Sequence, residues 1–91
     1  MLLLVTINLS KADIVLFELY EKTVLPLLPK YGAKLEIQLR ATDNSKEVHL
    51  LSFPDTKSHQ AYLEDGDRLR ARSIWDKCGA EASSIHVTDM K

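Results

Sequence analysis

The chain has 91 residues and a formal net charge of -1, and 27% of its residues are charged. This length predicts one domain, which spans residues 1–91. The near-neutral charge excludes strong electrostatic attraction to nucleic acid or to an anionic membrane, so we expect neither as a partner. The single cysteine excludes an internal disulfide and a multi-cysteine zinc site, and it favours a reducing compartment, the cytoplasm.

Two short segments, 2–9 and 48–53, are apolar at most positions, whereas segments 35–40 and 85–89 alternate between apolar and polar residues. A continuous apolar run indicates burial on both faces of a strand, and alternation indicates that one face meets water. The pattern therefore predicts two central strands flanked by two edge strands. The first segment lacks the basic start of a secretory signal and is too short to cross a bilayer, so we interpret it as a strand.

The first helix is predicted to begin near Lys11. Ser10 and Asp13 have the spacing of a helix cap, in which a side-chain oxygen accepts from an unpaired backbone amide. Pro26 lacks an amide hydrogen and crowds the preceding turn, so we expect a kink there. Gly32 then ends the helix, because glycine adopts the left-handed conformation of a helix end without strain.

The remaining elements complete a recognisable order. Segments 35–40 and 47–53 form a hairpin around polar turn residues, and a second helix follows Pro54 with Asp55 or Thr56 as its cap. That helix breaks at Gly66 and resumes over 68–78, and the last strand covers about 82–89. The order β-α-β-β-α-β predicts an α+β, ferredoxin-like fold, a four-stranded antiparallel sheet with both helices on one face.

The chain supplies helices for one face of this sheet only. The central strands are apolar on both faces, so we expect the other face to be covered by a second copy of the chain in a homodimer.

Three segments of the chain resemble a known group of proteins. They are 20–32 (YEKTVLPLLPKYG), 62–67 (YLEDGD) and 48–55, the last of which ends in Phe-Pro-Asp. The chain resembles the dimeric α/β-barrel superfamily, in which two ferredoxin-like subunits pack their sheets together. That group includes antibiotic-biosynthesis-type monooxygenases, lactone isomerases, haem-degrading enzymes and many uncharacterised proteins. The resemblance implies the fold and the homodimer more directly than it implies any activity.

In the cofactor-independent monooxygenases and haem-degrading members of the superfamily, a pocket lies between the sheet and the helices. The resemblance implies that Asn8 and Tyr62 correspond to an asparagine and an aromatic residue that line this pocket. A histidine or tyrosine after the helix break is missing here, because that region holds arginines. We therefore expect no haem and no other cofactor. The full candidate pocket comprises Asn8, Tyr20, Tyr62, Arg68 and Arg72.

Each of these residues also has a structural interpretation. Asn8 can be the polar end of a strand, Tyr62 a core aromatic residue, and the arginines a solvated helix face. His49, His59 and His86 are scattered, with no spacing typical of a metal site, so we expect no bound metal. His49 and His86 can both lie on the face between the two sheets, beside Glu36 or Arg40. A histidine–carboxylate pair there could act in general acid–base catalysis, but we favour the interpretation that they are polar groups of the interface.

No residue set identifies a catalytic mechanism, and two function classes remain open. One is a non-catalytic homodimer that binds a protein partner or a small metabolite, for which an aromatic or polyketide-like compound is the candidate. The alternative is a cofactor-independent monooxygenase or isomerase, in which Asn8 and Tyr62 orient the substrate and Arg68 or Arg72 stabilises developing negative charge. In both cases we expect the pocket on the helix side of the sheet, because the kink at Pro26 and the break at Gly66 prevent the helices from lying flush on it.

Overall fold

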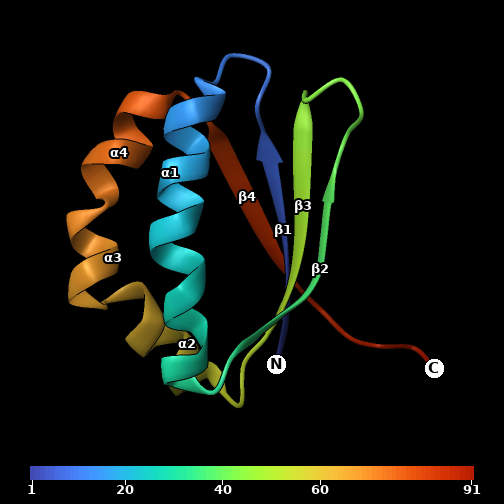
Figure 1. Cartoon of the computed structure of the whole chain (residues 1–91). Helices are drawn as coiled ribbons and strands as arrows, with labels where there is room; N and C mark the ends of the chain where they lie inside the picture. The colour runs from blue at the N-terminus through green and yellow to red at the C-terminus, as the bar shows by residue number, and fades with distance from the viewer.

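A four-stranded antiparallel sheet is covered on one face by helices in the computed structural model, which describes residues 1–91 (Figure 1). The strand order is β2-β3-β1-β4, so the two strands predicted to be central are central. The expected ferredoxin-like fold is confirmed. None of the helices has the length and apolar character needed to span a bilayer. The elements in chain order are β1 (Leu2–Asn8), α1 (Ile14–Val24), the 3-10 helix η1 (Leu25–Tyr31), β2 (Lys34–Arg40), β3 (Lys46–Ser52), α2 (Thr56–Leu63), α3 (Gly66–Arg70), α4 (Arg72–Cys78) and β4 (Glu81–Val87).

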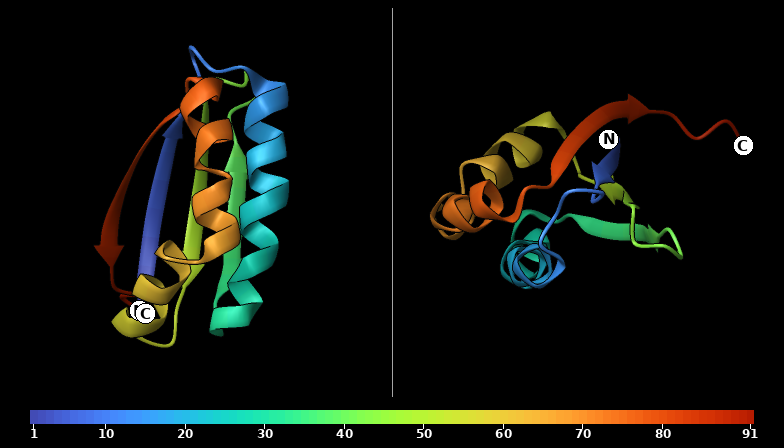
Figure 2. Two further views of the ribbon diagram at one scale, coloured as in Figure 1. Left: turned by 90° about the vertical axis from the view of Figure 1, so that its left-hand side faces the viewer. Right: turned by 90° about the horizontal axis from the view of Figure 1, so that it is seen from above.

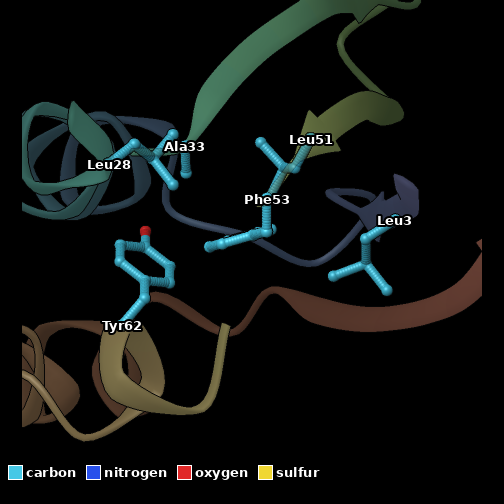
Figure 3. Close-up of a cluster of buried hydrophobic side chains, with 6 residues drawn as sticks. All are labelled: Leu3, Leu28, Ala33, Leu51, Phe53 and Tyr62. Carbon is cyan, nitrogen blue, oxygen red and sulfur yellow. The ribbon is translucent and has the colours of Figure 1, made fainter. Parts of the chain in front are cut away.

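The helices all lie on the same side of the sheet in the three ribbon views (Figures 1 and 2). Side chains alternate along a strand, so the odd-numbered residues of β1 from Leu3 to Ile7 face the helices, and the even-numbered residues face away. One buried cluster lies near the end of the sheet where β1 begins (Figure 3), and its members are Leu3, Leu28, Ala33, Leu51, Phe53 and Tyr62. A second buried cluster surrounds Phe17 and comprises Ile7, Leu9, Phe17, Cys78 and Ala80.

The edge strand β2 departs from simple alternation. Leu35 pairs with Leu51, but the next pair joins Ile37 to Leu50, because a β-bulge at this point adds one residue to β2. Odd-numbered residues of β2 face the helices before the bulge, and even-numbered residues face them after it. Gln38 and Arg40 consequently face the helices, although the sequence pattern placed their apolar neighbours there.

The first helix starts later than the sequence predicted. Asp13 is the residue that caps α1, and its side chain accepts a hydrogen bond from the backbone amide of Leu16 at 3.2 Å. Ser10 precedes the helix, and its hydroxyl donates to Asn8 instead. The expected kink at Pro26 is a change from α-helix to the 3-10 helix η1, which ends at Gly32 with a positive φ of 68°.

The second helical region is divided into three short helices. Asp55 caps α2, as expected, by accepting from the amide of Ser58 at 2.7 Å. The break near Gly66 is present, but Asp65 caps a new helix, α3, at that position. The region predicted as one helix from residue 68 is split at Ala71, and α4 then runs to Cys78 before Gly79, whose φ is 80°.

The sheet face away from the helices is apolar and uncovered. Its most exposed large side chains are Ile37, Leu39 and Ile85, with 46%, 63% and 59% of their surface exposed. The strand registers place further apolar residues beside them. We call this surface the open face, and its apolar members are Leu2, Leu4, Ile37, Leu39, Val48, Leu50, Ile85 and Val87.

Replacing Tyr62 by phenylalanine should lower the stability of the fold. The buried hydroxyl of Tyr62 donates to the carbonyl oxygen of Val24, the last residue of α1, at 3.1 Å. Its loss leaves a buried carbonyl without this partner, so we expect Tyr62→Phe to lower the free energy of unfolding by about 1 kcal/mol in urea titrations. Tyr20→Phe is the matched control, because the Tyr20 hydroxyl makes no hydrogen bond. Equal stability of the two variants would contradict this role.

Candidate ligand-binding site

A cavity of about 740 Å³ lies between the sheet and the helices. The odd-numbered residues of β1 form part of its floor, together with His49 and Leu51 of β3. Residues of α1, α2, α3 and α4 form the opposite wall, and residues 80–84 leading into and along β4 complete it. The expectation of a pocket on the helix side of the sheet is therefore confirmed.

Four of the five residues predicted for the pocket line this cavity: Tyr20, Tyr62, Arg68 and Arg72. Asn8 is the exception, and its assignment to the pocket is wrong. It has the same strand parity as the residues of the open face, and its side chain accepts from the amide and the hydroxyl of Ser10 at 3.0 and 2.8 Å. Asn8 therefore has the structural role of stabilising the turn after β1.

Aromatic rings dominate the helical wall of the cavity. Tyr20 packs against Trp75 with ring centres 5.1 Å apart, and Phe17 packs against the same indole at 6.4 Å. Further along, the ring of Tyr62 lines the cavity, although its hydroxyl is turned to the end of α1. Such a wall favours a flat, apolar ligand, because aromatic faces pack well against one another.

Arg68 brings a positive charge to this apolar wall. Its guanidinium carbon lies 5.1 Å from the centre of the Tyr62 ring, and the residue forms no ion pair with an acidic side chain. The buried Nε atom of Arg68 has no hydrogen-bond partner. A buried donor without a partner is uncommon in folded proteins, so this group is free to bind an acceptor in the cavity.

The position of Arg68 is fixed by Asp65. One carboxylate oxygen of Asp65 accepts from the backbone amides of Asp67 and Arg68, at 2.8 and 3.2 Å, and so caps the start of α3. The other oxygen accepts from Tyr31 and from Lys30, which lies 2.9 Å away. The hydrogen bond from Tyr31, followed by that from Lys30, lowers the pKa of Asp65. The ionised side chain thus anchors α3 to the end of η1.

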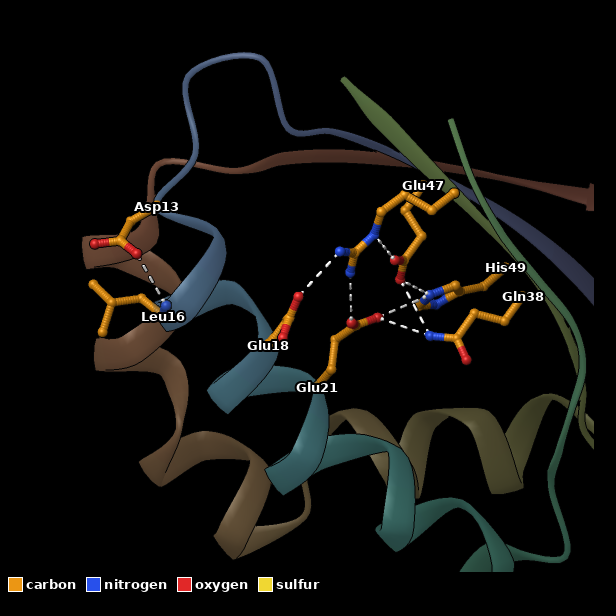
Figure 4. Close-up of polar contacts among 8 residues, drawn as sticks. Asp13, Leu16, Glu18, Glu21, Gln38, Glu47 and His49 are labelled. Atoms are coloured by element: carbon orange, nitrogen blue, oxygen red, sulfur yellow. Dashed lines mark hydrogen bonds and ion pairs between the residues drawn. The ribbon is translucent and has the colours of Figure 1, made fainter. Parts of the chain in front are cut away.

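Figure 4 shows a group of charged and polar side chains between α1 and the sheet. Two of them, Glu21 and His49, also line the cavity. Arg40 donates from Nε to Glu47 at 2.8 Å, and its Nη2 lies 3.6 Å from Glu21. His49 Nε2 lies 2.5 Å from Glu47 and 3.0 Å from Glu21. We call the group the buried polar cluster after its three buried members, Glu21, Glu47 and His49. The half-buried Arg40 and the exposed Gln38 complete it.

The contacts within the buried polar cluster change three pKa values. Burial alone would raise the pKa of Glu47, but hydrogen bonds with Glu21, His49 and Arg40 outweigh it and lower the pKa to about 2. Burial raises the pKa of Glu21, and its contact with Glu47 adds to this effect. Burial would lower the pKa of His49, but hydrogen bonds to both glutamates outweigh it and raise the pKa above 6.5. Folding therefore favours the protonated form of His49.

The surroundings of Glu21, Glu47 and His49 do not fit a metal ion, although the distances between their ligand atoms would allow one. Ligand atoms of Glu21, Glu47 and His49 lie within 4.8 Å of one another. Gln38 donates to the same oxygens of both glutamates at 3.3 Å, however, and Arg40 is paired with their other oxygens. A divalent cation would have to displace these donors and add charge to a cluster that is already balanced.

The sequence analysis did not predict the buried polar cluster. It placed His49 on the face between two sheets, and this placement is wrong, because His49 pairs with Val5 and faces the helices. One signal was present in the sequence: Glu47 and His49 share a strand face with Leu51, which puts two polar groups at core positions of a central strand. The position of Arg40 could not be foreseen, because it depends on the bulge in β2.

No family model matches the sequence, and no curated protein does so. Solved structures match over nearly the whole chain. SnoaB, a cofactor-independent oxygenase from Streptomyces nogalater, has a TM-score of 0.73 at 12% identity, over 98% of this chain and 94% of that chain. A dimeric ferredoxin-like protein of unknown function from Jannaschia sp. CCS1 has a TM-score of 0.68 at 16% identity, over 96% and 100%. An antibiotic biosynthesis monooxygenase has a TM-score of 0.68 at 9% identity, over 98% and 100%.

The chain has the ferredoxin-like fold of these proteins. The resemblance to this group that the sequence predicted is confirmed at the level of the fold. Identities of this size do not extend the likeness to activity or ligand, because one fold supports many unrelated functions.

The buried polar cluster predicts how stability varies with pH. A group whose pKa is raised by folding contributes stability below its unfolded pKa, and this contribution is lost as pH rises through the folded value. His49 is such a group. The free energy of unfolding should therefore fall as the pH rises above 6.5 toward the raised pKa of His49, as measured by urea titrations at several pH values. In His49→Gln this decrease should be absent, and an equal decrease in both proteins would assign it to another group.

Proposed function

We propose that the protein binds a small aromatic anion in the cavity between its sheet and its helices. The aromatic wall of Tyr20, Tyr62 and Trp75 suits a flat ring. The unpartnered, buried Nε of Arg68 is the observation that supports a negative charge on the ligand. A carboxylate or phenolate oxygen on the ligand would satisfy that donor and pair with the guanidinium.

The size of the cavity supports a small molecule of this kind. A volume of about 740 Å³ lies within the range typical of sites for small molecules. The mixture of apolar walls and few polar groups is also typical of such sites. Arg72, the second arginine of the lining, is exposed at the surface and interacts only weakly with Asp76 at 3.5 Å, so it can approach a ligand that enters.

Binding of naphthalene-2-carboxylate tests this proposal. The carboxylate should raise the melting temperature of the protein more than the neutral naphthalene-2-methanol does, because only the anion pairs with Arg68. In Arg68→Gln the affinity for the carboxylate should fall by about tenfold or more, the scale of one lost charge-assisted hydrogen bond, as measured by calorimetry.

Arg70→Gln is the matched control for this experiment. Arg70 belongs to the same helix but is paired with Asp67 on the exposed surface. Equal shifts with the acid and the alcohol, or equal affinities of Arg68→Gln and Arg70→Gln, would contradict the proposed site.

The second part of the proposal concerns the open face, which we infer is covered by a second copy of the chain. Supporting this inference, the face is apolar over all four strands, and one structure with the same fold is described as dimeric. An apolar surface that extends over a whole sheet is uncommon on a monomer. Packing two such faces together would give an interface in the larger, hydrophobic class.

Leu39→Glu should convert the dimer into a folded monomer. Leu39 lies on the open face with 63% of its surface exposed, so a charge there adds no strain within one chain but opposes burial in an interface. Light scattering during size exclusion should give the mass of two 10.3 kDa chains for the parent protein and of one for the variant. Val15→Glu, at an exposed apolar position of α1, should remain dimeric. A parent protein of one-chain mass would exclude this interface.

A cofactor-independent oxygenase is the second candidate, supported by the shared fold with SnoaB, which is described as an oxygenase of that kind. In this case Arg68 would stabilise negative charge on a bound substrate. The two candidates differ in a single readout. Oxygen consumption above the protein-free rate with a hydroxylated naphthalene would favour the oxygenase, and reversible binding without oxygen consumption would favour the binding protein.

A further inference from the structure

His49 has one nitrogen that is fully engaged and one that is free. Its Nε2 contacts both glutamates of the buried polar cluster, at 2.5 and 3.0 Å. Its Nδ1 makes no hydrogen bond, although only 5% of the residue is exposed and the residue lines the cavity. Nδ1 is not among the fully buried atoms that lack a partner, so it keeps some accessible surface, and the cavity is the space that His49 adjoins. A ring nitrogen in this position is expected to meet water or a ligand.

The charges around His49 favour the doubly protonated ring. The two buried carboxylates, on α1 and β3, face one guanidinium, that of Arg40 on β2. One negative charge remains, and the imidazolium balances it. Glu18 of α1 is paired with Arg40 on the exposed side, and Gln38 is neutral. From the other side of the cavity, the lining contains only His59 of α2 and the arginines Arg68 and Arg72 of α3 and α4 as further basic groups.

In this state Nδ1 carries a hydrogen that a ligand oxygen can accept. A neutral hydroxyl would accept a weak hydrogen bond, whereas an oxyanion would accept a charge-assisted one. The apolar surroundings strengthen this difference, because the interaction is less screened than in water. The site should therefore discriminate between the two protonation states of a ligand whose hydroxyl is acidic.

We propose that His49 binds the oxyanion of an acidic phenol or enol through Nδ1–H, so that the cavity selects the ionised form of its ligand. This inference rests on the proposed binding of an aromatic anion in the cavity, and it names the class of anion. The O–H bond of the ligand is broken before or during entry, and its proton passes to water. The electron pair that stays on the oxygen accepts the hydrogen bond from His49. The same Nδ1–H can return a proton to that oxygen, which leaves a neutral ring and a neutral ligand.

The dye 4-nitrophenol tests the proposal, because its phenolate is yellow and its phenol is almost colourless. Equilibrium dialysis measures how much dye binds, and the absorption spectrum measures its protonation state at a pH below its own pKa. We expect the bound dye to have a ratio of phenolate to phenol about tenfold or more above that of the free dye. In His49→Gln the dye should bind mainly as the phenol, whereas His86→Gln should behave as the parent protein.

His86 of β4 is the matched control because it is exposed, does not line the cavity and has no carboxylate partner. If His49→Gln does not fold, nitrogen NMR of the parent protein labelled at histidine replaces it. The Nδ1 resonance of His49 should then move strongly when the dye binds, and the Nε2 resonance should move little.

The outcomes separate this inference from the proposed function. Failure of the dye to bind in dialysis would contradict both. Binding of the dye as the neutral phenol would overturn the role of His49 and leave the cavity as a ligand site. A yellow bound dye in His49→Gln, or an unchanged Nδ1 resonance, would assign the selection of the anion to another group, and this too would overturn the proposal.

Discussion

The ion pairing among Arg40, Glu47, His49 and Glu21 is the constraint on which the cavity depends. These groups join β2, β3 and α1 at a point where the helix would otherwise pack on an apolar sheet. Each buried ion loses hydration worth several kcal/mol, and only good pairing recovers it. The pairing therefore holds α1 at a fixed distance and orientation over β3. Each glutamate contacts both Arg40 and His49, so the removal of one member would leave the remaining charges with fewer partners and lower the stability of the fold.

This anchoring explains why the cavity is not closed by the neighbouring helices. The α1 helix is held over β3, and the three short helices α2, α3 and α4 form the rest of the layer. Interruptions at Asp65 and Ala71 keep those helices from following a single straight line. The space that remains is lined by aromatic rings and by Arg68. The capping of α3 by Asp65 then decides where that arginine lies, so a residue outside the cavity positions one inside it.

Much of the fold followed from the sequence, and the reasons are local. The apolar runs of β1 and β3 predicted that these strands are central, and Pro54 and Asp55 predicted where α2 begins. The resemblance and the helix break pointed to Tyr62, Arg68 and Arg72, which line the cavity. The face of β1 on which Asn8 lies could not be predicted. Strand parity depends on the exact register, and a shift of one residue reverses the face of every side chain. The boundaries of the split helix were also missed, since Ala71 carries no signal of a helix end.

The bulge in β2 connects the two surfaces that the proposals concern. One extra residue near Glu36 turns Gln38 and Arg40 toward the helices, and it turns Ile37 and Leu39 to the open face in the same step. In a regular strand, two aliphatic side chains would lie beside Glu47 and His49, whose charges would then lack the guanidinium. The open face would in turn carry an amide and a guanidinium, which oppose the packing of two apolar sheets. A single irregularity of the backbone therefore makes the interior able to hold charge and keeps the opposite surface apolar, as the proposed dimer requires.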